Sequence, residues 1–377
     1  MKLFFDIRNV CRASLMAAAT ATLCSCSLMH DDLPDCATRP QTRTNVSFVY
    51  DYNTAGEDKF PESVGSVTLY VFDENGSLVR EIEHSASSTG GSLNQPGFSV
   101  DLDLPAGTYQ LYAAAQESAD GYAASLETPG AKFRRPATAE GFMASDMVFS
   151  LDHNAGTVEH QQMPLEHLWL THIPQILTVT EAPMPAEGDP QPADVIIQAT
   201  VPLQRVTNNI HLTLTRDLTG TPATRAAETL SPADYDIWIS TATGRDRLDL
   251  VGNPTQDATT LTFTPHATQS ATANGQGAVE ADLSVSRLFT DSDAARHDKL
   301  CIRAKLSGEV FEFDLPSLLT QCSAAYPGNN WSEQEFLDRE YDYNIAVHFD
   351  ERDMRWKFVE LSVGILKWHK RIQNADL

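Results

Sequence analysis

Apolar and polar residues alternate along most of this chain, which is the pattern of half-buried β-strands. The alternation predicts one strand over Val46–Tyr52. In Val67–Phe72 both alternating sets are apolar, so we expect this strand to be central in its sheet and covered on both faces. Asn75-Gly76 then allows the positive backbone angles of a tight hairpin, and Leu78–Ile82 should return beside the central strand.

The segment Phe98–Leu104 has one apolar and one polar face, which predicts a strand with one face exposed to solvent. A turn is expected at Pro105–Tyr109, because proline fixes one turn angle and glycine permits another. The chain then resumes as a strand through Ala113. This corner resembles those of transthyretin-like sandwiches.

The second half of the chain repeats the period of two. The strands expected there are Ile210–Leu214, Tyr235–Ile239, Val279–Val285, Leu300–Leu306, Glu309–Leu315, Tyr341–Phe349 and Trp356–Leu366. Ser307-Gly308 should join two of them as a two-residue hairpin turn. Helix is scarce, and the best candidate is Ser332–Glu340, where Ser332 and Glu335 have capping-box spacing. Many short strands separated by turn signals indicate an all-β protein of two tandem sandwiches.

A proline-rich polar stretch at residues 181–192 has too little apolar surface to pack into a core. It is either an interdomain linker or a long hairpin loop between Ile176–Thr180 and Val195–Val201. We place the domain boundary here. One sandwich is expected over residues 45–180 and a second over residues 181–377.

The first 25 residues have the layout of a secretory signal peptide. Three basic residues precede an apolar run at residues 13–23, which is too short to cross a bilayer. The run closes on Leu23-Cys24-Ser25-Cys26, which resembles the bacterial lipobox. We therefore expect cleavage before Cys26 and diacylation of its sulfur, so that residues 26–44 form a lipidated tether.

Two details of this N-terminal region leave alternatives. Cys24 is a poorer acylation site than Cys26, because bulky Leu23 would then stand directly before the cleavage point. Asp31-Asp32 resembles the surface-export signal of Bacteroidetes lipoproteins, although His30 replaces the usual lysine. A plain solvated tether accounts for these acidic residues equally well.

The formal net charge of −24 over 377 residues argues against nucleic acid as a partner, because phosphates require basic patches. It suits a protein that faces outward and repels like molecules. No apolar stretch after Cys26 approaches the roughly 20 residues of a transmembrane helix. The lipid is therefore the only membrane attachment that the sequence predicts.

Six cysteines occur in the chain, and Cys36, Cys301 and Cys322 remain once the signal peptide and the acylated residue are set aside. An exported compartment permits disulfides. Three thiols leave at least one unpaired, and the sequence does not choose among the three pairs. No CxxC pair remains, so neither a zinc knuckle nor a thioredoxin-like site is supported.

No catalytic constellation stands out. His153, His160, His167 and His172 fall close together but match no zinc-ligand spacing. The GxSxG elbow, the GxxxxGK loop and a marked carboxylate pair are absent. We therefore expect no catalytic residue, no metal and no cofactor. The five tryptophans could form a sugar-stacking platform, but most lie in or beside strands, where core or interface packing is expected: Trp169, Trp238, Trp331, Trp356 and Trp368.

Taken together, these segments resemble the FimB/Mfa2 family of fimbrial anchor subunits from Bacteroidales. The motifs that carry the resemblance are the lipidated cysteine, Asp32-Leu33-Pro34-Asp35-Cys36, Phe48–Asn53, Phe60-Pro61, Val67–Gly76, Val201–Val206, Glu335–Arg339 and Tyr341–Tyr343. The family usually shows an Asn-Gly-Trp turn near the C-terminus, where this chain has Val363–Trp368 instead. The resemblance implies two tandem transthyretin-like sandwiches and no enzymatic activity.

The resemblance also implies a role. The protein would be held on the surface of the cell outer membrane by its N-terminal lipid. It would anchor and terminate a fimbria by β-strand docking to fimbrial stalk subunits. Stalk subunits lose their first strand to a protease, whereas an anchor should keep Val46–Tyr52, since cleavage at Arg39 or Arg43 just before it would sever the lipid.

Two questions stay open at this stage. Tyr341–Phe349 and Trp356–Leu366 are either an edge offered to a stalk subunit or ordinary internal strands. The main alternative function is a surface glycan-binding lipoprotein of a polysaccharide-uptake system, which an exposed row of tryptophans would favour. A secreted hydrolase would need a cleft with convergent carboxylates or histidines.

Overall fold

The computed structural model describes residues 41–183, 194–216, 229–241, 245–255, 259–273, 275–350, 355–363 and 370–373. Residues 43–180 and 196–377 belong to one compact unit, and the contacts reported below lie within it. Among the described residues, no helix has both the length and the apolar character needed to cross a membrane.

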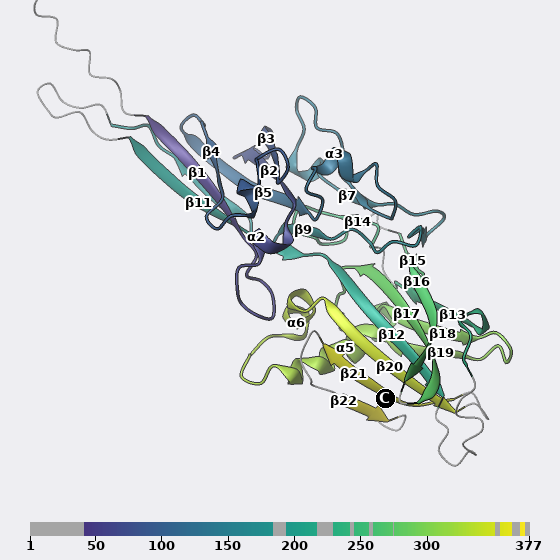
Figure 1. Ribbon diagram of the computed structural model, residues 1–377. Helices are drawn as coiled ribbons and strands as arrows, with labels where there is room; N and C mark the ends of the chain where they lie inside the picture. Colours follow the sequence, from purple (N-terminus) through teal and green to yellow (C-terminus); the bar gives the residue numbers. More distant parts are fainter. Residues whose placement is uncertain are drawn as a thin grey trace, which may run out of the picture. The chain divides into compact units, whose positions relative to one another are not determined.

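Seven strands of the first half of the chain and β11 build an eight-stranded sheet in the order β3-β2-β5-β9-β11-β1-β4, with β10 paired to β5. Its strands are β1 (Thr42–Val49), β2 (Ser66–Asp73), β3 (Leu78–Ser85), β4 (Ser99–Leu102), β5 (Gly107–Gln116), β9 (Leu168–Thr171), β10 (Gln175–Val179) and β11 (Val195–Arg205). Figure 1 shows β1 lying between β4 and β11. The strand expected at residues 46–52 is therefore an internal strand of this sheet, but it begins earlier, at Thr42, and ends at Val49.

The prediction of a central, doubly covered strand at β2 is confirmed. Seven of its eight residues are buried, and it pairs with β3 on one side and β5 on the other. Alternate residues of β2 pack into two different hydrophobic clusters. Leu69 and Val71 belong to one cluster, and Tyr70 and Phe72 belong to the other. The hairpin to β3 is also confirmed, with Gly76 at φ 81° in its turn.

The second half builds a six-stranded sheet in the order β16-β17-β12-β20-β21-β22. Its strands are β12 (Thr207–Arg216), β16 (Ala267–Ala273), β17 (Gln276–Ser286), β20 (Asp342–Asp350), β21 (Arg355–Val363) and β22 (Lys370–Gln373). β12 and β20 run parallel, with Ile210 opposite Tyr343, and the other neighbours are antiparallel.

Two smaller sheets join segments from both halves. One has the order β19-β18-β13-β15-β8 and the other β14-β7-β6. Their strands are β6 (Phe133–Arg134), β7 (Phe149–Leu151), β8 (Thr157–Val158), β13 (Tyr235–Ser240), β14 (Arg247–Leu248), β15 (Thr262–Phe263), β18 (Lys299–Ala304) and β19 (Val310–Asp314). The pairs β7–β14, β8–β15 and β9–β11 each link strands from the two sides of residue 180. Residues 184–193 lie outside the described part, and the division into two sandwiches at residue 180 stays a prediction.

The described helices are all short. The α-helices are α2 (Phe60–Ser63), α3 (Tyr122–Ser125), α5 (Leu315–Leu319) and α6 (Glu333–Arg339), and the 3-10 segments are Ser92–Asn94, Ala144–Asp146, Pro232–Asp234, Ala294–Arg296 and Thr320–Ala325. The predicted helix is confirmed in α6, where the Glu335 amide donates to Ser332 Oγ at 3.1 Å. The Glu335 carboxylate accepts from Arg339 rather than closing a capping box.

The predicted hairpin after Leu300 is present, but its turn is longer than expected and its second strand ends earlier. β18 stops at Ala304 and β19 starts at Val310, so the turn is longer than two residues and leaves Leu306 fully exposed. Strand structure was expected to reach Leu315, but α5 begins there. Asp314 Oδ1 accepts from the Ser317 amide at 3.0 Å, and proline stands in the first helical turn, which together start a helix.

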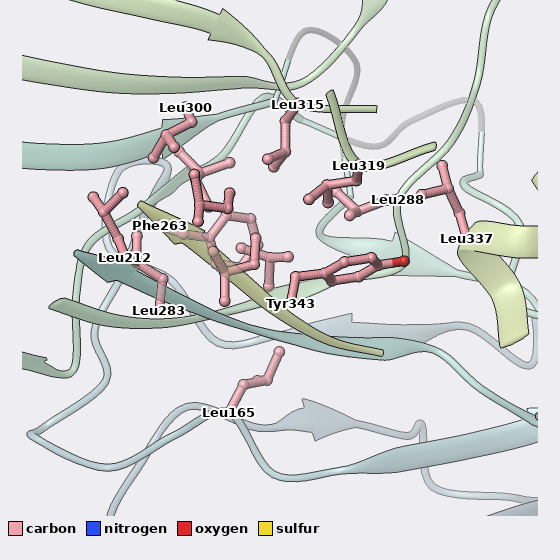
Figure 2. Close-up of a cluster of buried hydrophobic side chains, with 14 of the residues drawn as sticks. Leu165, Leu212, Phe263, Leu283, Leu288, Leu300, Leu315, Leu319, Leu337 and Tyr343 are labelled. Carbon is pink, nitrogen blue, oxygen red and sulfur yellow. The ribbon is translucent and has the colours of Figure 1, made fainter. Parts of the chain in front are cut away.

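Figure 2 shows the centre of the larger hydrophobic cluster. Leu212, Leu283 and Tyr343 come from the six-stranded sheet, and helical residues such as Leu319 and Leu337 pack with them. All five are at most 2% exposed. Strands make up most of the described elements, so the all-β class expected from the alternation is confirmed.

Candidate functional site

The first described strand, β1, covers the first part of the segment that the sequence predicts the mature protein to retain. It pairs with β4 in antiparallel register, with Val46 opposite Val100. Val46, Phe48 and Tyr50 are 0%, 6% and 1% exposed and belong to the same hydrophobic cluster. Polar residues on the other face bond to neighbouring strands, as when Asn45 Nδ2 donates to Ser99 Oγ at 2.8 Å. β1 is thus an integral part of the core.

Arg43 does not precede this strand, as the sequence suggested, but lies inside it. Its neighbour Thr44 is buried and faces Leu102 of β4, while Arg43 itself is exposed. A protease that cleaves after Arg43 would therefore have to open the start of β1. Arg39 and the rest of the tether lie outside the described residues.

The segment after β1 is tied to the C-terminal helix. The Arg339 guanidinium lies 4.1 Å from the centre of the Tyr52 ring, and its Nη1 donates to the Asn53 carbonyl at 3.4 Å. The His172 ring also stacks on Tyr52, with ring centres 3.8 Å apart. These contacts connect the end of the first strand to α6.

The two C-terminal strands that the sequence offered as an edge are internal. β20 lies between β12 and β21, and β21 lies between β20 and β22. Val347, Val359 and Leu361 from these strands are at most 1% exposed. Within the described part of this sheet, the outer strands are β16 and β22, and β22 was missed because Lys370–Gln373 holds a single apolar residue.

The outer strands of the two large sheets differ in charge. β3 carries charged side chains along the exposed edge of its sheet, including Arg80, Glu81 and Glu83. β22 carries Lys370 and Arg371, whereas β16 has the uncharged sequence ATQSATA. Charges on an edge strand oppose indiscriminate pairing. A specific partner strand can still add to such an edge through main-chain hydrogen bonds.

The structure tests the cysteine predictions for two residues, Cys301 and Cys322. Cys26, the expected acylation site, and Cys36 lie outside the described residues. Cys301 and Cys322 are buried and free, so they do not pair with each other. Burial raises the pKa of Cys301 to about 11 and that of Cys322 to about 12.

The four histidines that lie close together in the sequence contact four different partners in the structure. His153 lies 3.4 Å from Asp246, and His172 stacks on Tyr52. His160 is buried against Phe263, and His167 lies 3.3 Å from Glu117. In the portion of the chain that the structure covers, no three His, Cys, Asp or Glu side chains are grouped to hold a metal ion.

The tryptophans that the structure describes make protein contacts. Trp169 is 2% exposed, Trp331 packs against Tyr326, and Trp356 meets Phe313 edge-on. Trp238 lies under the Arg303 guanidinium at 5.8 Å. Trp368 lies outside the described residues. Those four do not form an exposed row at sugar-ring spacing.

The sequence matches the family model of the fimbrillin-A associated anchor proteins Mfa1 and Mfa2 over residues 33–374. The chain belongs to this anchor-protein family. The resemblance drawn from the sequence motifs is therefore confirmed. A comparison with curated proteins returns no significant match.

Solved structures share the fold of this anchor-protein chain. A candidate polysaccharide-binding protein from Bacteroides thetaiotaomicron has 24% identity and a TM-score of 0.67, covering 89% of this chain and 100% of that one. A candidate adhesin from the same species has 23% identity and a TM-score of 0.68, with coverages of 90% and 100%. The fimbrial anchor protein Mfa2 from Porphyromonas gingivalis has 13% identity and a TM-score of 0.56, with coverages of 86% and 98%.

Proposed function

We propose that this chain is a non-enzymatic lipoprotein that anchors a fimbria in the outer membrane and terminates it by β-strand docking to stalk subunits. Membership of the anchor-protein family over residues 33–374 carries the proposal. Cys26 holds the protein in the membrane through its acyl chains, each buried methylene contributing about 0.8 kcal/mol.

Retention of β1 fits a subunit that ends a fibre. The strand places Val46, Phe48 and Tyr50 in the core, and removing it would expose that core and part the tether from the fold. A stalk-type subunit gains by losing its first strand, because the vacated groove receives a neighbour. In an anchor, the same proteolytic cleavage would separate the protein from its membrane-attached N-terminus.

The docking edge is assigned to β22, the outer strand nearest to the C-terminus of the chain. β22 pairs with β21 through Val359 opposite Ile372, which leaves its other edge for a partner strand in the described sheet. The main-chain groups of that edge would supply affinity, and the alternating side chains would supply specificity.

Acylation is tested by palmitate labelling in the native host. Cys26→Ala should lose the label and release the protein from the outer-membrane fraction. Cys24→Ala is the matched control, since it changes the neighbouring thiol and should keep both. Label that persists in Cys26→Ala, or a native N-terminus at Thr44, would contradict lipid anchoring through a retained β1.

Docking is tested by capture of stalk subunits from the native outer membrane. Deleting residues 370–377 removes β22 but leaves β21 paired with β20, so capture should be lost with a fall in Tm of only a few degrees. Gln269→Lys adds a charge to the opposite outer strand, β16, and should leave capture intact. Full capture by the truncated chain would place the docking edge elsewhere.

The glycan-binding alternative has one point in its favour, the description of a structural neighbour as a candidate polysaccharide-binding protein. The observation that would have favoured it, an exposed row of tryptophans, is not met by the four tryptophans in the described residues. The anchor role therefore stands as the proposed function.

A further inference from the structure

A cavity of about 380 Å³ is lined by residues that come from eight separate places in the chain. Trp169 lies in β9, Arg205 ends β11, and Tyr50 directly follows β1. Tyr341 comes from just before β20, and Glu117 from just after β5. The volume is in the range of small-molecule pockets, which is about 300–1,000 Å³.

Three hydrogen-bond donors at this cavity lie on, or directly after, neighbouring strands. Trp169 and Arg205 are directly opposite each other where β9 pairs with β11, and β1 lies next to β11. The Tyr50 ring meets Trp169 edge-on, with ring centres 5.9 Å apart. Tyr50, Trp169 and Arg205 are only 1%, 2% and 7% exposed. The inner wall of the cavity is therefore polar and shielded from solvent.

These donors are not satisfied by the rest of the described chain. Trp169 Nε1, Arg205 Nη2 and the Tyr50 hydroxyl are buried without a hydrogen-bond partner within 3.5 Å, and the Tyr50 hydroxyl interacts more loosely with Trp169 and Tyr341. Buried polar groups are almost always paired, and leaving a charged one unpaired is especially costly. Arg205 Nη2 in particular, a buried charged donor with no acceptor, indicates that an acceptor belongs beside it.

The positive charge of Arg205 indicates that the missing acceptor is an anion. Its Nε donates to Thr207 Oγ1 at 3.2 Å, and its guanidinium lies 4.3 Å from the Tyr341 ring centre. Neither partner carries a negative charge, and no carboxylate of the described residues forms an ion pair with Arg205 within 4.0 Å. Burial lowers the pKa of Arg205.

The carboxylates whose charges act on Arg205 through space, Asp342 and Glu117, have closer partners of their own. Glu117 Oε2 lies 3.3 Å from His167 Nδ1, and Asp342 Oδ1 accepts from Asn209 at 2.8 Å. Burial lowers the pKa of His167 to about 3, so its ring is neutral and does not compete for an anion. Arg205 is thus the cation that faces the cavity.

We propose that this cavity binds a small carboxylate whose oxygens accept from Arg205, Trp169 and Tyr50. The planar guanidinium matches a carboxylate, and charge-assisted hydrogen bonds of this kind are among the strongest in proteins. Glu62 and Glu117 line the same cavity, and their charges disfavour a doubly charged phosphate over a singly charged group. The carboxylate belongs either to an acidic monosaccharide or to the C-terminus of a peptide. This inference is independent of the anchor role.

Tryptophan-labelled ¹⁵N spectra of the full chain in detergent test the proposal, because Trp169→Phe identifies the Trp169 indole resonance. Sodium acetate should shift that resonance saturably, and acetamide should not. Comparing glucuronate with glucose tests for an acidic monosaccharide. Comparing N-acetylglycine with N-acetylglycinamide tests for the C-terminus of a peptide. Sodium chloride at equal ionic strength controls for screening.

Variants connect the signal to the three donors. Arg205→Met should weaken acetate binding at least tenfold, and Arg303→Met, which removes an exposed arginine elsewhere, should leave it unchanged. Tyr50→Phe deletes one donor without changing the ring, so it should weaken binding by several-fold even where Arg205→Met fails to fold. If no carboxylate shifts the Trp169 resonance more than its neutral analogue does, or if only ordered water fills the cavity in a crystal grown with acetate, the proposal fails.

Discussion

Arg287 and Asp338 form a two-point ion pair inside the protein. Arg287 Nε donates to Asp338 Oδ1 at 2.7 Å, and Nη2 donates to Oδ2 at 2.8 Å. The pair joins the residue after β17 to α6, and both side chains are mostly shielded from water. Arg287 Nη1 also donates to the Gly252 carbonyl at 3.2 Å, so one guanidinium holds three segments together.

Breaking this pair should be costly because it leaves a charged arginine buried without its partner. We expect Asp338→Asn to lower the free energy of unfolding by about 3–5 kcal/mol. Urea denaturation followed by tryptophan fluorescence measures the change. Asp236→Asn is the matched control, because its pair with Arg303 is exposed and should contribute less than about 1 kcal/mol. Equal losses in the two variants would show that burial does not set the strength of the Arg287 pair.

Gly65 is required for a close approach of two backbone segments. A Cβ built at this position would lie 2.1 Å from the Glu117 carbonyl oxygen and 2.6 Å from the Ser118 carbonyl carbon. Because both atoms belong to the backbone, the strands β2 and β5 would have to separate. Gly65→Ala should therefore destabilise the protein by more than about 2 kcal/mol.

Thermal unfolding of the Gly65 variant should be compared with that of Gly107→Ala. The atoms nearest to a Cβ at Gly107 would belong to the Tyr109 side chain, at 3.3 Å and beyond, and not to the backbone. We expect a small change in Tm for Gly107→Ala and a large fall for Gly65→Ala. Similar Tm values for both variants would mean that the β2–β5 contact is looser than the structure indicates.

Local signals in the sequence were enough to predict several elements. The apolar run of β2, the Asn75-Gly76 turn and the Ser332 cap each act within a few residues of the chain, and each has the predicted structure. The start of α5 could also have been found, since Asp314 followed by Pro316 is a helix-start signal. These features depend on backbone geometry and neighbouring side chains alone.

Long-range pairings could not be predicted in the same way. The parallel pairing of β12 with β20 brings Ile210 beside Tyr343, and nothing in either segment specifies the other. The internal position of β21 follows from β22, which has too few apolar residues to be recognised. Edge and centre are properties of the assembled sheet, so sequence alternation does not distinguish them.

The carboxylate cavity was missed for a similar reason, although one signal was present. Val201, Leu203 and Arg205 alternate onto one buried face of β11, and a charged residue there is unusual. That pattern could have marked Arg205 as a buried cation. Its meeting with Trp169 and Tyr50 depends on the order β9-β11-β1, which only the fold supplies.

Cys301 and Cys322 should be unreactive in the native protein. The thiolate is the nucleophile, and burial raises the pKa of Cys301 to about 11 and of Cys322 to about 12. Iodoacetamide at pH 8 should therefore label neither residue until denaturant is added, as read by peptide mass spectrometry. Leu306→Cys places a thiol at a fully exposed position and should be labelled at once. Labelling of Cys301 in the folded protein would show that β18 opens.

His160 should make the protein sensitive to acid. Its side chain is 3% exposed, both ring nitrogens lack hydrogen-bond partners in the described chain, and the His266 ring lies 5.9 Å away. Burial, aided by His266, lowers the pKa of His160 from 6.5 to about 4. Between these values the unfolded chain binds a proton that the folded chain does not. Stability contributed by the neutral ring is therefore present above pH 6.5 and is lost as the pH falls toward 4.

Replacing the ring by one that cannot be protonated should remove this dependence. We expect His160→Phe to recover up to about 3 kcal/mol of the stability that the native protein loses between pH 6.5 and 4. Urea denaturation at several pH values measures the slope. Phe263→Leu, which alters the same packing without a titrating group, should lower stability by an equal amount at each pH. An unchanged slope in His160→Phe would mean that His160 is protonated in the folded protein and that other groups cause any acid sensitivity.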